Sequence, residues 1–225
     1  MKAPTLHLLD QTSCLRLRSG VQKYLAIMDL YWKVSVVDDN DFQRLFKGYY
    51  RIRQRPAAWY AQYFRMLEQL KTTNRSFREV LQELYERTGR LEVSFASKML
   101  ATRNPELPVI DRWVLDNLQL RLPGYLEQDR VQKVVQLYDR IVTWYHEFLK
   151  TPTGKQALRM FDNLISHCDI TAVKKIDFIL WQTRTNGALP APRGTRHKPS
   201  VENYRTDHRT GTKGTRNSDY LQHIP

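Results

Sequence analysis

Apolar residues recur along most of this chain at the spacing of an amphipathic helix. Phe42, Phe46 and Tyr49 mark one such face, with cations between them. A helical turn holds about 3.6 residues, so side chains three or four positions apart lie on one side of a helix. The alternation of apolar and polar residues that predicts strands is limited to a short β-prone piece at 33–37. The pattern therefore predicts an all-α fold.

Start and stop signals place the individual helices. Pro56 suits the first turn of the helix that follows it. Ser76 or Asn74 suits the N-cap of the next helix, and Gly89 suits its end. The predicted helices, besides the one around Phe42, are 20–33, 59–70, 75–88, 94–103, 111–119, 128–149, 154–166 and 170–183, the last with Asp169 as its N-cap.

A change in composition near residue 186 divides the chain. Residues 186–225 are rich in Gly, Pro, Thr, Arg and Asn and have almost no aliphatic side chains. Such a segment buries too little apolar surface to offset the entropy lost on ordering. We predict one helical domain over 1–185, with a hairpin region at 75–118, and a basic disordered tail over 186–225. The tail either adds nonspecific phosphate contacts or is inert.

The chain carries a formal net charge of +13, which favours a polyanionic partner, most commonly nucleic acid. The tail has seven Lys or Arg against three acids, so most of the excess charge belongs to the helical domain. No stretch approaches the roughly 20 apolar residues that span a bilayer. We therefore expect duplex DNA as the partner and no membrane association.

Cysteine and histidine usage argues against several other classes of protein. Cys14 and Cys168 are too few for a disulfide framework, and no Cys or His spacing predicts a metal site. Residues 1–19 lack the apolar run of a secretory signal. We expect a cytoplasmic monomer that needs no metal and no cofactor.

The segment 42–53 interleaves cations with aromatic residues. Arg44, Lys47 and Arg51 are its candidate nucleic-acid contacts, because such mixtures stack bases and neutralise phosphates. The alternative is an ordinary amphipathic helix with an aromatic core face and a solvated basic face. Helical periodicity explains most of the aromatic residues, and we favour this second interpretation.

The most informative stretch contains Lys98 and Asp111. Lys98 follows a group of small residues, and Asp111 opens a helix after a Pro-bounded loop. An amine and a carboxylate brought together near helix N-termini can act as a nucleophile and its acid–base partner. Asp111 also suits a helix N-cap, and Lys98 also suits a solvated helix face beside buried Phe95 and Met99. Both interpretations stay open on the sequence alone.

Residues 75–118 resemble the core of the helix-hairpin-helix DNA glycosylases, in particular the 8-oxoguanine glycosylase branch. That family has Gly-x-Gly-x-Lys in its hairpin, and this chain has Ser-Phe-Ala-Ser-Lys at 94–98. The family's aspartate motif corresponds to Pro-Val-Ile-Asp-Arg at 108–112. The rest of the chain is similar only in being helical and of about the right size. The resemblance implies two helical lobes around a DNA cleft.

The resemblance also implies an activity and its residues. Lys98 would be the Schiff-base nucleophile of a base-excision glycosylase with AP-lyase activity on damaged purine. Asp111 would support Lys98 and the positive charge that develops on the sugar. The residues that it places against DNA are Ser94, Ala96, Ser97 and Arg112, with Trp113 as the stacking partner of the flipped base.

Departures from the family leave other functional classes open. Ser94 and Ala96 replace the glycines that let a hairpin backbone approach a phosphate. Lys98 and Asp111 are also closer in sequence than in the family. A degenerate hairpin fits a remote active glycosylase, which we favour, or a noncatalytic DNA-binding or accessory protein associated with defence or mobile elements. A third class is a protein–protein module whose basic surface meets an acidic partner.

Overall fold

The computed structural model describes residues 11–52, 55–165 and 168–183, and every regular element in these ranges is a helix. The all-α prediction is confirmed, whereas the glycosylase-like arrangement with two lobes stays a prediction. The predicted tail at 186–225 lies outside the described residues. The helices are α1 (Gln11–Lys33), α2 (Asn40–Tyr49), α3 (Ala57–Gln69), α4 (Phe77–Thr88), α5 (Val93–Arg103), α6 (Arg112–Asn117), α7 (Arg130–Lys150), α8 (Pro152–Leu164) and α9 (Ala172–Gln182).

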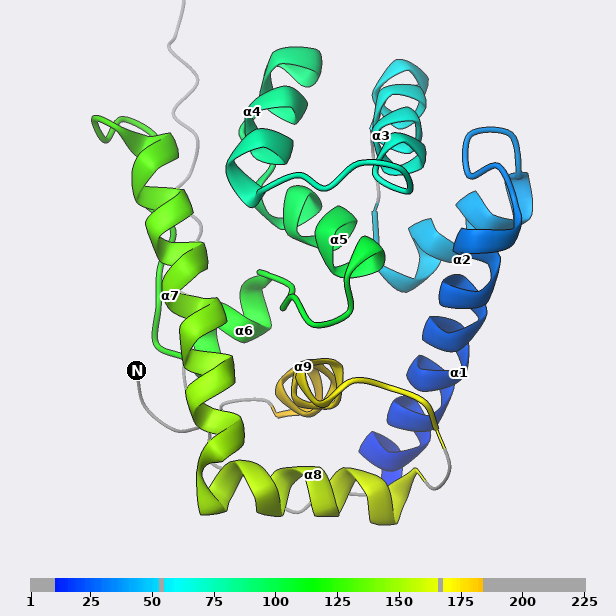
Figure 1. Ribbon diagram of the computed structural model, residues 1–225, viewed down its shortest axis with the longest axis vertical. Coiled ribbons are helices and arrows are strands. Elements are labelled where there is room, and N and C mark those ends of the chain that lie inside the picture. The colour runs from blue at the N-terminus through cyan, green and yellow to red at the C-terminus, as the bar shows by residue number, and fades with distance from the viewer. Residues whose placement is uncertain (1–10, 53–54, 166–167, 184–225) are drawn as a thin grey trace, which may run out of the picture. The chain divides into compact units, whose positions relative to one another are not determined.

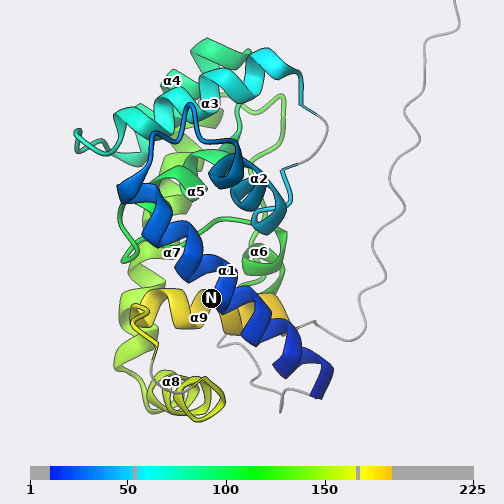
Figure 2. The same ribbon diagram turned by 90° about the vertical axis from the view of Figure 1, so that its right-hand side faces the viewer.

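Helix α9 lies at the centre of the arrangement. It packs against α1, α6, α7 and α8, while α4 packs against α3, α5 and α7 (Figure 1). Turning the view shows α1 running across α9 and α2 above α6 (Figure 2). Most of α9 is buried, including Val173, Ile176 and Leu180. Among the described helices, none is both long and apolar enough to cross a bilayer.

Helix α1 begins well before its predicted start near residue 20. The interior Gly20 resembles a break in the pattern, but the buried face of Leu17, Val21 and Tyr24 continues through it at helical spacing. A Cβ built on Gly20 would lie 3.3 Å from the Phe178 ring, so the glycine lets α1 approach α9 closely. The predicted start near 20 is therefore wrong, and Gly20 is a point of close packing between α1 and α9.

The β-prone piece at 33–37 forms a turn between α1 and α2. Val36 is fully buried, and its N–H donates to the Glu68 carboxylate at 2.8 Å. The Gln43 side-chain amide donates to the carbonyls of Val36 and Val37. Side chains therefore satisfy the backbone groups that a neighbouring strand would otherwise satisfy.

Local capping signals predict the ends of α4 correctly but not the N-cap of α9. Ser76 and Glu79 form a capping box at the start of α4, and Gly89 ends that helix with φ of 67°, so both predictions are confirmed. The N-cap of α9 is Thr171 rather than Asp169. The Thr171 hydroxyl accepts from the Lys174 N–H and donates to the carbonyl of Pro105 at 2.8 Å, which ties the helix start to a distant loop.

The corner between α7 and α8 depends on Gly154. Thr151 ends α7 and caps α8, accepting from the Gly154 N–H at 3.0 Å. A Cβ on Gly154 would collide with the carbonyl oxygen of Phe148, whereas a Cβ on Gly48 of α2 would meet nothing within 4 Å. A side chain at position 154 would therefore meet backbone atoms, whereas one at position 48 would meet open space. Gly48 is thus a suitable control for Gly154.

We predict that Gly154→Ala lowers the free energy of unfolding by about 1–3 kcal/mol, because the backbone at the corner must move. Gly48→Ala is expected to leave it unchanged or to raise it by up to about 1 kcal/mol, because alanine favours helix. Urea unfolding of the two variants checks both signs. Equal effects would show that the corner tolerates a side chain.

Candidate functional site

The described part of the chain holds a pocket of about 490 Å³ that brings Lys98 and Asp111 together. Its walls come from α1, the end of α2, α5, the start of α6 and α9. Asp111 is the only carboxylate among the lining residues. The lining cations are Arg16, Lys23, Arg51 and Lys98, and the lining aromatic residues are Tyr49, Tyr50, Trp113, Phe178 and Trp181.

Lys98 lies in the middle of α5, not near its N-terminus and not on a solvated face. The residue is 8% exposed, and every residue from Ala96 to Thr102 is buried. The ammonium donates to the backbone carbonyl of Tyr50 at 3.4 Å and lies 4.9 Å from the centre of the Phe95 ring. An amine in such surroundings has lost most of its hydration.

This burial changes the chemistry of the amine. Loss of hydration lowers the pKa of Lys98 from 10.5 to about 8, although the carboxylates of Asp111 and Glu92 act in the opposite direction. About one Lys98 amine in ten is therefore uncharged at pH 7. The uncharged amine is the form that attacks an electrophile.

Asp111 is the N-cap of α6, as predicted. Its carboxylate accepts from the Val114 N–H at 2.9 Å. Burial raises the pKa of Asp111 from 3.8 to about 6, while the Val114 N–H and the Lys98 ammonium act to lower it. The group is still mostly ionised at neutral pH, at a cost in stability that an exposed N-cap would not carry.

Lys98 and Asp111 do not form a contact ion pair, since the Lys98 hydrogen bond goes to Tyr50. A buried lysine and aspartate in direct contact favour each other's charged forms. Lys174 and Asp177 of α9 form such a pair at 2.7 Å. Burial disfavours the Lys174 charge, but Asp177 and nearby phenols still raise its pKa above the ordinary value. At the pocket the pKa of Lys98 is lowered and that of Asp111 is raised, which is the reverse of what a contact ion pair produces. The two charges therefore do not neutralise each other.

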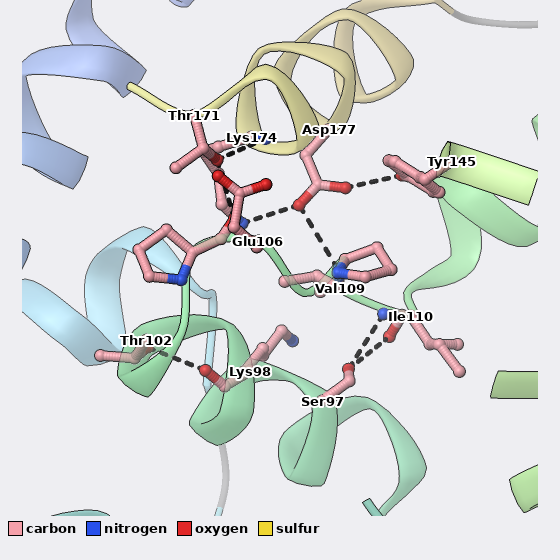
Figure 3. Close-up of polar contacts among 12 residues, drawn as sticks. Ser97, Lys98, Thr102, Glu106, Val109, Ile110, Tyr145, Thr171, Lys174 and Asp177 are labelled. Atoms are coloured by element: carbon pink, nitrogen blue, oxygen red, sulfur yellow. Dashed lines mark hydrogen bonds and ion pairs between the residues drawn. The ribbon is translucent and has the colours of Figure 1, made fainter. Parts of the chain in front are cut away.

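The Lys174–Asp177 pair holds the loop that leads to Asp111. Both side chains are fully buried, and Asp177 also accepts from the Tyr145 phenol at 2.6 Å. The same carboxylate accepts from the Val109 N–H at 3.4 Å. Figure 3 shows Lys174 and Asp177 projecting from α9 toward this loop, with α5 on its other side. The loop is therefore tied to α9 two residues before Asp111.

Three further hydrogen bonds fix the same loop. Ile110 N–H donates to the Ser97 hydroxyl at 2.9 Å, next to Lys98 (Figure 3). The Tyr138 phenol donates to the carbonyl of Pro108, and the Thr171 hydroxyl to that of Pro105. Asp111 is thus positioned from α5, α7 and α9 together. Lys174 and Asp177 were not predicted as site residues, although three charges (Lys174, Lys175 and Asp177) on a largely apolar helix were a visible signal.

The small residues before Lys98 have a packing role. Ala96 and Ser97 are completely buried inside α5, and Ser94 is half-buried. Neither Ala96 nor Ser97 reaches the surface, and their predicted contact with DNA stays a prediction. The turn between α4 and α5 lies earlier, at 89–92, where Gly89 supplies the left-handed conformation.

The predicted nucleic-acid contacts divide into two groups. Arg51 and Trp113 line the pocket beside Lys98 and Asp111. Arg44, Lys47 and Arg112 lie outside it: Arg44 pairs with Asp41, Lys47 covers the Tyr60 ring, and Arg112 pairs with Asp116. The pocket walls contributed by Arg16, Lys23 and Trp181 were missed, because α1 and α9 are brought to α5 only by tertiary packing.

Comparisons with protein-family models, with curated proteins and with solved structures gave no match. Within 11–52, 55–165 and 168–183, no group of three or more His, Cys, Asp or Glu lies together as metal ligands would. The pocket and the state of its two ionisable groups are therefore the features from which a function can be inferred.

We predict that Lys98→Met raises the free energy of unfolding at pH 7 by roughly 1–3 kcal/mol, because it removes a buried, unneutralised charge. Between pH 8 and 10.5 the unfolded wild type binds more protons than the folded one, so wild-type stability rises with pH there. The advantage of Lys98→Met should therefore shrink over that range. Urea unfolding at pH 7 and pH 10 tests this, and a less stable variant at pH 7 would contradict it.

The same substitution at the other buried lysine should have the opposite sign. Lys174→Met leaves the buried Asp177 carboxylate without its cation, so we expect a loss of about 3–5 kcal/mol in the free energy of unfolding. The exposed Lys150, paired with Glu147 on the surface, is the control and should change little on mutation to Met. A tolerated Lys174→Met would mean that the pair does not hold the loop.

Proposed function

We propose that this chain is a DNA base-excision repair glycosylase with an AP-lyase step, acting on damaged purine in duplex DNA. One observation carries the proposal: a buried amine with a lowered pKa and a carboxylate with a raised pKa line the same pocket. Strongly shifted groups that share a pocket are typical of catalytic sites. A pocket of about 490 Å³ is also of the size that takes small organic ligands.

The remaining walls of the pocket suit a nucleotide. The aromatic side chains of Tyr49, Trp113 and Trp181 offer surfaces on which a base can stack. Three exposed cations, Arg16, Lys23 and Arg51, line the same pocket and can contact phosphates. The combination of aromatic walls, exposed cations and a buried amine supports a flipped-out nucleotide better than an acidic protein partner.

Arg51 adds a separate argument for anion binding. It follows the end of α2 with φ of 53°, a conformation that favours glycine and costs other residues about 1 kcal/mol. The turn is closed by the Ile52 N–H donating to the carbonyl of Lys47 at 2.9 Å. An exposed arginine is kept where glycine would be more stable, which supports a role for its charge at the pocket.

The chemistry starts with a base extruded from the duplex, because its C1′ is inaccessible in the stack. Uncharged Lys98 attacks C1′, and the base leaves with the electron pair of the glycosidic bond. The ionised Asp111 stabilises the positive charge on the sugar as that bond lengthens. Loss of a proton from the Lys98 nitrogen and opening of the sugar ring give an imine. Removal of a C2′ proton then allows β-elimination of the 3′ phosphate.

One observation favours a noncatalytic alternative, a helical DNA-binding or accessory protein. Ala96 and Ser97 are buried, so this chain lacks an exposed hairpin of small residues at the positions where the family contacts phosphate. In that case the pocket would bind a nucleotide without chemistry. Duplex binding would then be salt-sensitive and would survive loss of both Lys98 and Asp111.

The decisive test is reduction of the imine. With borohydride and a duplex containing 8-oxoguanine, we predict that wild type forms a covalent complex and that Lys98→Met forms none. The trapping rate should rise from pH 6 to pH 9, since Asp111 ionises near 6 and Lys98 becomes uncharged near 8. Lys150→Met, which lies outside the pocket, is the control and should trap as wild type does.

Asp111→Asn separates charge from capping. Asparagine caps a helix as well as aspartate does, so stability should not fall. Trapping should slow by about 100-fold, because the charge that stabilises the sugar cation is lost. Absence of any trapped species with wild type, and no base release from a panel of lesions, would rule out the lyase and leave the noncatalytic alternative.

A further inference from the structure

Two buried polar atoms in the pocket lining have no hydrogen-bond partner: the Tyr49 hydroxyl and the Trp181 indole nitrogen. Their rings meet edge to face at 5.8 Å between centroids, one from the end of α2 and the other from α9. The other buried side-chain atoms without a hydrogen-bond partner in the described ranges belong to Arg55, Trp59 and Glu92, none of which lines the pocket, and the Glu92 oxygen forms an ion pair with Arg55. The pocket therefore contains its own pair of unsatisfied groups.

Such groups are uncommon, because burying a polar atom without a partner costs stability. The other buried phenols show how this chain usually avoids that cost. Tyr31 and Tyr63 donate to the carbonyls of Leu67 and Phe95. Tyr138 and Tyr145 likewise donate, to a loop carbonyl and to a carboxylate. An unpartnered phenol beside an unpartnered indole, in the same pocket as the shifted ionisable groups, indicates that a ligand supplies the partners.

The chemistry of the two groups restricts the ligand. An indole N–H only donates, so the ligand must present an acceptor to Trp181. Burial raises the pKa of Tyr49 well above its ordinary value, so its phenol stays protonated and can donate or accept. The aromatic surfaces around both groups favour a flat ligand. A purely apolar ligand would leave both groups unsatisfied.

We propose that Tyr49 and Trp181 determine the specificity of the site by hydrogen bonding to the edge of the flipped base. This assignment rests on the proposed function. Both residues line the pocket while their polar atoms are buried, so each ring must rotate to bring its polar atom to the base. The accepted base is a heterocycle with a carbonyl or an unprotonated ring nitrogen on that edge. An abasic sugar forms no hydrogen bond with either residue, so neither residue contributes to its binding.

The test compares two duplexes that differ at one position, 8-oxoguanine in one and a tetrahydrofuran abasic analogue in the other. Binding is measured with the full chain carrying Lys98→Met, so that no base is removed. Tyr49→Phe and Trp181→Phe should each weaken binding to the 8-oxoguanine duplex about fivefold to tenfold. Their binding to the tetrahydrofuran duplex should stay unchanged, because that duplex has no base to read.

Thermal unfolding supplies the second measurement. Tyr49→Phe should not lower the Tm, because the phenol has no partner to lose. Tyr63→Phe is the matched control: its phenol bonds to Phe95 and lies outside the pocket, so its Tm should fall while both affinities stay unchanged. A lower Tm for Tyr49→Phe would show that its phenol is partnered within the fold, and would overturn the proposal.

The binding results separate this proposal from the proposed function. If the protein prefers 8-oxoguanine over an unmodified duplex but the two variants bind as their parent does, the specificity assignment is wrong and the glycosylase proposal stands. If the two variants lose the same affinity for the 8-oxoguanine duplex as for the tetrahydrofuran duplex, the specificity assignment is also wrong and the glycosylase proposal stands. If the parent shows no preference for 8-oxoguanine over unmodified and tetrahydrofuran duplexes, the proposed function fails and this assignment fails with it.

Discussion

The buried ion pair between Lys174 and Asp177 is the interaction on which the pocket depends. The Asp177 carboxylate binds the Lys174 ammonium, the Tyr145 phenol and the Val109 N–H. It therefore joins α9, α7 and the loop before Asp111 at one point. Because α9 also packs against α1, α6 and α8, this point fixes Asp111 relative to the other pocket walls. The catalytic carboxylate that we propose is thus held from the core and needs no contact with Lys98.

The chain contains two buried lysine–aspartate combinations with different consequences. Lys174 and Asp177 touch, so each compensates the buried charge of the other. Lys98 and Asp111 face one pocket without touching, so burial dominates and moves the pKa of each group toward neutrality. That arrangement weakens the fold, and proteins keep such weak points mainly where function needs them. The Tyr49 hydroxyl and the Trp181 indole nitrogen lack hydrogen-bond partners, which adds a further cost in stability at the same pocket.

Local signals in the sequence were enough for the fold class and for several helix ends. The N-caps at Ser76, one of two candidates, and at Asp111 need only neighbouring residues, and the structure has both. That Lys98 and Asp111 line one pocket was an expectation from the family resemblance, since the residues alone left structural roles open for both. The burial of Ala96 and Ser97 was not expected, because small residues suit a tightly packed helix as well as an exposed hairpin. The α1 and α9 walls depend on tertiary packing, which no local pattern specifies.

The central claim is that Lys98 is a buried amine made reactive by its surroundings. NMR titration of the protein with isotopically labelled lysine side chains measures this directly, with Lys98→Met used to assign the signal. We predict a pKa near 8 for Lys98, well separated from the signals of exposed lysines. A Lys98 signal that titrates near 10.5 with the exposed lysines would contradict the claim, and with it the role of Lys98 as a nucleophile.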